Sequence, residues 1–147
     1  MVRIRETNNL CYAVTNFQCA IQMIDEMKKS DDEAMSDFGR MSLAVVHMRE
    51  GVKLLREFLE GNRYNYDFPK AFREAIRIKN GEIGGFIDWF DEDLTADYAK
   101  DITHEQVGLA SGGSYSANRE LFFDIIPVLS EYVAKLSGFI ARMKSLE

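Results

Sequence analysis

"MSLAVVHMREGVKLLREFL", residues 41–59, decides the fold class of this chain. Apolar side chains recur there at every third or fourth position, and cations such as Arg49 and Arg56 occupy the opposite side. This period matches the 3.6 residues per turn of an α-helix, so the stretch predicts one helix with a buried face and a charged face. Gly61-Asn62 is a plausible stop for this helix. Its apolar stripe consists of Met41, Val45, Met48, Val52, Leu55 and Leu59.

The same period recurs in three other stretches, at about residues 10–27, 66–80 and 117–147. We expect the third of the four helices to end at Asn80-Gly81, because Asn and Gly favour a helix C-cap. Gly84-Gly85 would then let the chain turn closely over the bundle, with the aromatic residues that follow fixing the loop. Residues 84–114 have weak periodicity and predict a long ordered crossover between the third and fourth helices.

Length and composition indicate one mainly α domain over residues 1–147, a bundle of four principal helices. The chain has 147 residues, of which 46% are hydrophobic, enough for a core of this size. The most apolar stretch, residues 121–140, contains charged residues, so we expect no membrane span. The two cysteines, Cys11 and Cys19, are eight apart and too distant on one helix to bridge, which favours reduced thiols in the cytoplasm. No motif predicts a metal or a cofactor.

The negative charge of the chain is concentrated in one block. Residues 88–105 hold seven carboxylates against Lys100, a balance of −6 that equals the formal net charge of the whole chain. We predict a non-enzymatic interaction or regulatory protein that presents residues 86–105 to a basic protein partner. Such a surface would mimic nucleic acid, as expected of an inhibitor from a phage or a defence system. The residues assigned to it are Phe86, Asp88, Trp89, Phe90, Asp91, Glu92, Asp93, Asp97 and Asp101.

One alternative to this surface stays open, and one is disfavoured. The acidic block is also explained as a solvated loop that keeps the protein in solution. Direct binding of RNA or DNA is disfavoured, because the acidic block lies beside the basic stripe of Lys70, Arg73 and Arg77 and would repel phosphate.

"RIKNGEIGGFID", residues 77–88, resembles the site of HEPN-like helical-bundle proteins. The resemblance places Lys79-Asn80 at that family's Arg-polar pair and Phe86 at its ribonuclease histidine. Phe cannot transfer a proton and Lys lacks the fork of Arg, so the resemblance implies a non-catalytic member of the family.

An altered ribonuclease or nucleotide-binding site is the alternative to a non-catalytic bundle. In it Arg77, Lys79 and Asn80 would hold phosphate, and His47 or His104 would supply acid–base chemistry. The simpler interpretation makes His47 a histidine at the edge of the core and His104 a solvated side chain among acids.

Apolar side chains outside the main stripes predict self-association. The fourth helix has a wide apolar face, and the first carries Cys11, Tyr12, Ala20 and Met23 outside its stripe. Large exposed apolar patches are uncommon on monomers, so we expect a homodimer through the first or fourth helix. The alternative is that the crossover covers these residues.

Overall fold

The computed structural model describes residues 4–29, 34–65, 68–94 and 112–145, and these form a helical bundle. The long helices are α1 (Ile4–Lys29), α2 (Ala34–Gly61), α3 (Lys70–Trp89) and α5 (Gly112–Ser145). A π-helical turn, η1 (Phe90–Leu94), continues α3. No strand occurs among the described residues. The predicted mainly α bundle of four principal helices is therefore confirmed.

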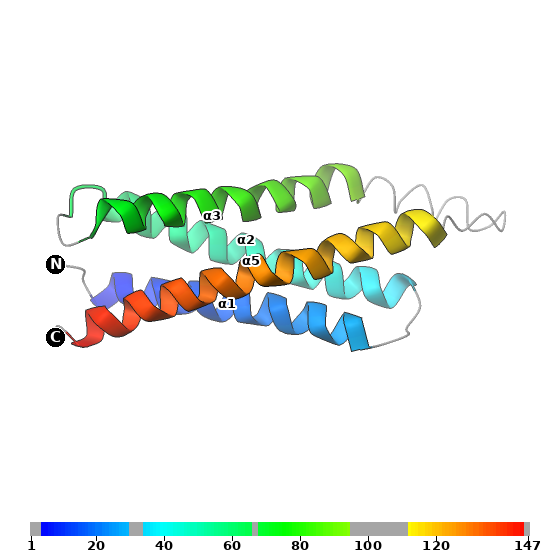
Figure 1. Cartoon of the computed structure of the whole chain (residues 1–147), viewed down its shortest axis with the longest axis horizontal. Coiled ribbons are helices and arrows are strands. Elements are labelled where there is room, and N and C mark those ends of the chain that lie inside the picture. The colour runs from blue at the N-terminus through cyan, green and yellow to red at the C-terminus, as the bar shows by residue number, and fades with distance from the viewer. Residues whose placement is uncertain (1–3, 30–33, 66–67, 95–111, 146–147) are drawn as a thin grey trace.

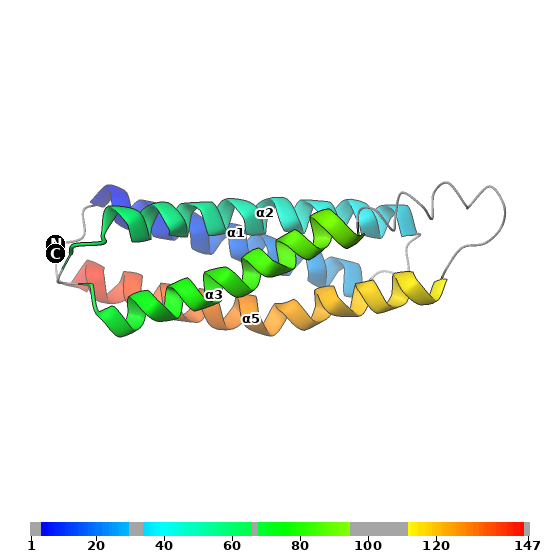
Figure 2. The same cartoon turned by 90° about the horizontal axis from the view of Figure 1, so that it is seen from above.

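The four helices alternate in direction along the chain (Figure 1). Each runs antiparallel to the one before it, so the beginning of α1 and the end of α5 lie at the same end of the bundle (Figures 1 and 2). α1 packs against α2 and α5, and α3 packs against the same two helices. α2 and α3 therefore lie side by side, with a shared outer surface between them.

Aromatic side chains fill the core at three levels. In the middle, the rings of Phe17 and Tyr132 lie 5.3 Å apart, and the Tyr132 hydroxyl donates to the Ile76 carbonyl at 3.0 Å. Burial raises the pKa of Tyr132 well above its usual value, so the hydroxyl stays a donor. Phe58, Phe68, Phe72 and Phe139 pack together near the α2–α3 connection. Phe38, Phe86, Trp89, Phe90 and Phe122 pack together at the opposite end.

The predicted end of the third helix is wrong, because α3 continues through Asn80-Gly81 and Gly84-Gly85 to Trp89. Ile83 and Ile87 extend the buried stripe that Ile76 begins. Burying each such side chain contributes about 1.5–3 kcal/mol, whereas a glycine inside a helix costs about 1 kcal/mol. Packing against the other helices therefore outweighs the local stop signal.

The boundaries of the crossover differ from the prediction as well. Phe86 and Trp89 lie on α3 and Phe90 on η1, not in a loop, and all three contact the ring of Phe122 on α5. The helical path lasts to Leu94, and α5 begins at Gly112, five residues before the expected start. The rest of the predicted crossover, residues 95–111, lies outside the described residues.

No helix in the described part of the chain is both long and apolar enough to cross a membrane.

Candidate functional site

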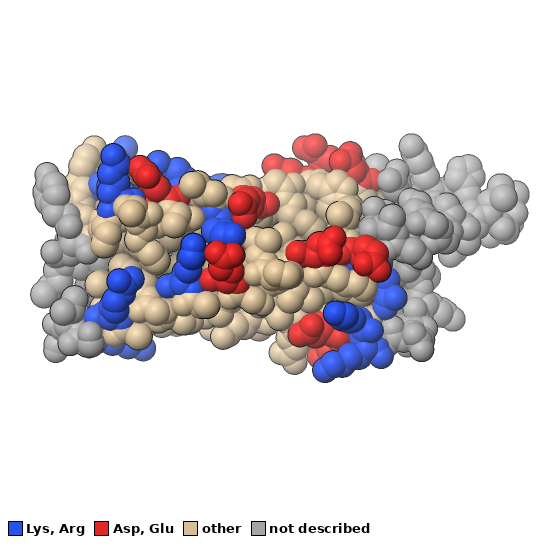
Figure 3. All heavy atoms as spheres, in the orientation of Figure 1, with Lys and Arg blue, Asp and Glu red and all other residues tan. Residues whose placement is uncertain are grey.

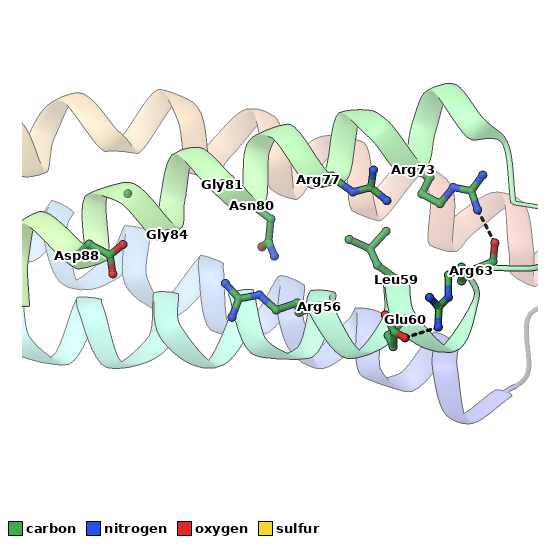
Figure 4. A pocket seen from close by; sticks show the side chains of 11 residues that line it. Arg56, Leu59, Glu60, Arg63, Arg73, Arg77, Asn80, Gly81, Gly84 and Asp88 are labelled. Carbon is green, nitrogen blue, oxygen red and sulfur yellow. Dashed lines mark hydrogen bonds and ion pairs between the residues drawn. The ribbon is translucent and has the colours of Figure 1, made fainter.

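A groove of about 530 Å³ runs along the outer surface between α2 and α3 (Figure 4). Its volume lies in the range of protein binding sites, about 300–1,000 Å³. The α3 wall is one helical face, because its members recur at every third or fourth position. α3 contributes Arg73, Arg77, Asn80, Gly81, Gly84, Gly85 and Asp88, α2 contributes Arg56, Leu59 and Glu60, and the connection after α2 contributes Arg63.

Three polar contacts fix how the two walls align. The Asn80 Nδ2 donates to the Val52 carbonyl at 3.2 Å. Toward the α2–α3 connection, Arg73 donates to the carbonyl of Arg63 at 2.7 Å. Toward the other end, Arg49 Nη2 binds both carboxylate oxygens of Asp91, at 2.8 and 2.7 Å. The groove is therefore lined by residues from fixed positions on two antiparallel helices.

The half of the groove nearer the start of α3 is basic. Arg56 projects from α2 and Arg77 from α3, and both guanidinium groups lie in the space between the two helices (Figure 4). Arg63, in contrast, is paired with Glu60 at 2.7 Å. Neither Arg56 nor Arg77 has a carboxylate partner in the part of the chain that the structure describes. Two exposed cations are therefore left available to an anionic group.

Asn80 lies between these two arginines and is only 6% exposed. Figure 4 shows its side chain pointing from α3 toward α2. Its Oδ1 atom is buried and has no hydrogen-bond partner among the described atoms. A buried acceptor without a partner costs about 1–3 kcal/mol, and each such group in a native protein calls for an explanation.

The middle of the groove has a floor of bare helix backbone at Gly81, Gly84 and Gly85. A Cβ atom added at any of the three would meet no other atom within 4 Å. Packing inside the described chain therefore does not require glycine at these positions. Each glycine in a helix interior costs about 0.5–1 kcal/mol relative to Ala. The three together weaken α3 and leave a smooth strip on its surface.

The far end of the groove is acidic. Asp88 lines it, and the exposed carboxylates of Glu92 and Asp93 follow on η1. Among the described residues, Asp88, Glu92 and Asp93 have no cation within ion-pair distance. They lie near the C-terminal end of α3, where the helix dipole disfavours negative charge. Along α3 the surface thus changes from basic at its start to acidic at its end (Figure 3).

The aromatic residues of the predicted acidic surface were expected to be exposed to a partner, but they pack in or against the core. Phe90 is 6% exposed and belongs to the core, while Phe86 and Trp89 are half-buried against Phe122. The exposed part of this surface is therefore carried by its carboxylates. Asp97 and Asp101, the other two residues assigned to it, lie outside the described residues.

Lys79 does not line the groove, unlike Arg77 and Asn80. Its Nζ lies 3.2 Å from Glu131 on α5 and 3.5 Å from Glu82. The hydrogen bond with Glu131 raises the pKa of Lys79 and lowers that of Glu131. Lys79 therefore joins α3 to α5 on another side of the helix. The structure does not bring it together with Arg77 and Asn80, the other two residues predicted to hold phosphate.

His47 lies on a different side of α2 from the groove. Its Nδ1 is 3.0 Å from Oδ1 of Asn16 on α1, as expected for a histidine at the edge of the core. Nine residues separate His47 from Arg56, a rotation of about 180° around the helix. No imidazole lines the groove within the described residues, and His104 lies outside them.

Sequence reasoning missed Arg56 and the role of the glycines. The spacing of Arg73, Arg77, Gly84 and Asp88 was a visible signal for one helix face, but it was obscured by the expected helix end at Asn80-Gly81. The position of Arg56 in the groove depends on the alignment of α2 with α3, which sequence spacing does not reveal. Comparison with known proteins finds no matching family model, no matching curated protein and no matching solved structure.

Proposed function

We propose that this chain is a non-enzymatic interaction protein that docks a protein partner along the α2–α3 groove. One observation carries the proposal: charges of both signs, without an ion-pair partner among the described residues, lie at the two ends of a glycine floor on one helix face. The partner offers acidic groups to Arg56 and Arg77 and basic groups to Asp88 and Glu92. The cytoplasm is the proposed location, because Cys11 and Cys19 are unbridged and thiols stay reduced there.

The composition of the groove favours a polypeptide over a nucleic acid. Asp88 would repel a phosphate backbone that ran the full length of the groove, and the net charge of −6 disfavours the approach of any polyanion. Single-stranded nucleic acid is held by stacking on aromatic side chains, and none lines this groove within the described part of the chain. Bare backbone at Gly84 instead lets another main chain or helix approach closely.

The test is zero-length carboxyl–amine and photo-induced cross-linking in cell extract, with the cross-linked sites mapped by mass spectrometry. Products joined at α3 are expected with the wild-type chain and should be lost in an Arg56→Ala/Arg77→Ala variant. Lys53→Ala is the matched control, because this exposed cation lies on α2 outside the groove lining. Cross-linked products that persist in the double variant would overturn the proposal. A product counts whether it contains a second copy or another protein.

A second candidate function is binding of a small phosphate-bearing ligand, as the resemblance to HEPN-like proteins implies. Arg56 and Arg77 both line the groove, one on each side of Asn80, and these two cations favour an anion there. Titration with pyrophosphate or ATP, followed by fluorescence of the single Trp89, should then saturate and fail in the Arg56→Ala/Arg77→Ala variant. RNA cleavage that is lost in His47→Ala or His104→Ala would favour the enzymatic form.

A further inference from the structure

The charge pattern on the groove-facing side of α3 is complementary to the same pattern read in the opposite direction. Reading along α3 and on into η1, two cations are followed by two glycines and then by two carboxylates: Arg73, Arg77, Gly81, Gly84 and Asp88 on α3, and Glu92 on η1. Arg77 and Asp88 lie equally far from the midpoint of Gly81 and Gly84, and so do Arg73 and Glu92. At about 100° per residue the five positions on α3 fall within about 80° of one another around the helix.

From this pattern we infer that the partner is a second copy of this chain, bound antiparallel through α3 about a two-fold axis at the glycine floor. The inference rests on the proposed function, because it names the partner of the same groove. A two-fold axis between Gly81 and Gly84 brings Arg77 to Asp88 of the partner subunit. The same operation repeats the pair with the roles exchanged, as in every isologous interface.

Charges that the single chain leaves without an ion-pair partner among the described residues find counterparts in this dimer. Arg77 and Asp88 are exposed and have no ion-pair partner among the described residues, and both become paired. Arg56 projects into the same groove beside Arg77 and adds a second cation for the incoming carboxylates (Figure 4). The carboxylates that lie unfavourably at the end of α3 come to lie beside the start of the partner's α3, where the dipole favours them.

The glycine floor explains how two helices approach closely enough for these pairs. Helix axes pack 8–10 Å apart depending on the side chains between them, and glycine allows the lower end of that range. The part of the stripe on α3, from Arg73 to Asp88, is about 22 Å long, at 1.5 Å per residue.

α3 is a better candidate for this contact than the first or fourth helix. Ala20 on α1 is fully buried, and Cys11 and Met23 pack against the core. Among the described residues, the large apolar side chains left exposed on α1 and α5 are Tyr12 and Leu121. Most of the apolar surplus that predicted a dimer there is therefore used inside the bundle.

Charge reversal at one pair tests the two-fold arrangement. Arg77→Glu places a carboxylate at both members of the 77–88 pair, and Asp88→Arg places a cation at both members. We expect each variant alone to self-associate at least tenfold more weakly than the wild type in analytical ultracentrifugation at low salt. A 1:1 mixture of the two should form a heterodimer, and the double variant Arg77→Glu/Asp88→Arg should recover self-association. Helical circular dichroism and the urea unfolding midpoint confirm that each variant is folded.

Substitution of a glycine in the groove is an independent test, because it should change the stability of the single chain and its self-association in opposite directions. Gly84→Ala should stabilise the single chain, because the added Cβ meets nothing within 4 Å and Ala favours the helix. The same change should weaken self-association severalfold, since the methyl group separates the two helices. Gly138→Ala on α5 is the matched control: its Cβ also meets nothing, and it should leave association unchanged.

The outcomes separate this inference from the proposed function. A wild-type chain that sediments as a monomer at high micromolar concentration overturns the self-association inference. So does a mixture of Arg77→Glu and Asp88→Arg that forms no heterodimer. If cross-linking in extract still joins α3 to another protein, and the product needs Arg56 and Arg77, the proposed function stands with a different partner.

Discussion

Gly51 on α2 is a glycine that the packing of this chain requires. A Cβ atom at this position would lie 2.6 Å from the ring of Phe17 on α1, whose side chain is fully buried. We predict that Gly51→Ala destabilises the protein by about 1–3 kcal/mol, the usual effect of overpacking a core. Urea unfolding followed by Trp89 fluorescence measures it. Gly138→Ala is the control and should be neutral or stabilising; equal midpoints for Gly51→Ala and wild type would contradict the packing argument.

Single residues also show the limit of sequence interpretation. The apolar residues at helical spacing were assigned correctly, because burial imposes the 3.6-residue period on the sequence itself. Lys79 and Asn80 are neighbours in the sequence, yet one reaches α5 and the other α2. A motif that pairs adjacent residues does not tell which neighbouring helix each side chain reaches. That depends on how the helices pack in the bundle.

At the scale of elements, the ion pair between Lys79 and Glu131 joins α3 to α5. Lys79 lowers the pKa of Glu131 from 4.5, so the contribution of Glu131 to stability is present above that value and is lost as pH falls through the folded pKa. Lys79 has its pKa raised from 10.5, and its contribution is lost only as pH rises through the still higher folded value. We predict that Glu131→Gln lowers the urea midpoint at pH 7 and that this difference shrinks below about pH 4.5.

Measurement of the two midpoints from pH 7 down to pH 3 checks this prediction. Glu57→Gln is the control, because this exposed carboxyl on α2 has no ion pair within the described residues. It should show a smaller difference at neutral pH. A Glu131→Gln difference that stays constant, or grows, as the pH falls would show that the pair contributes nothing through ionisation.

The length of α3 was the feature of the fold that was hardest to predict from the sequence. Asn80-Gly81 and Gly84-Gly85 are strong local signals for a helix end, and their glycines lower the stability of the helix. They are overridden by Ile83 and Ile87, whose burial depends on α2 and α5 being in place. The groove could not be predicted for the same reason, since a face that runs from Arg73 to Asp88 exists only if the helix is continuous.

At the scale of the whole molecule, the proposed dimer is held by charge, and this distinguishes it from a dimer held by apolar surface. The α2–α3 groove has one aliphatic side chain in its lining, Leu59, against six charged ones among the described residues. Exposed ion pairs are individually worth about 0–1 kcal/mol, so several must act together to hold two copies. The association should accordingly be weak and reversible, with little change in helix content.

We therefore predict that added salt dissociates the assembly. The Debye length falls from about 10 Å at 0.1 M to about 3 Å at 1 M ionic strength, which screens the exposed pairs of Arg77 with Asp88. At a fixed protein concentration, the weight-average mass from light scattering should fall toward that of one 16.9 kDa chain as sodium chloride is raised. The urea midpoint of the isolated chain is the control for stability. An apolar interface on α1 or α5 would persist or strengthen in salt, because salting out favours burial, so a mass that holds or rises would exclude the α3 dimer.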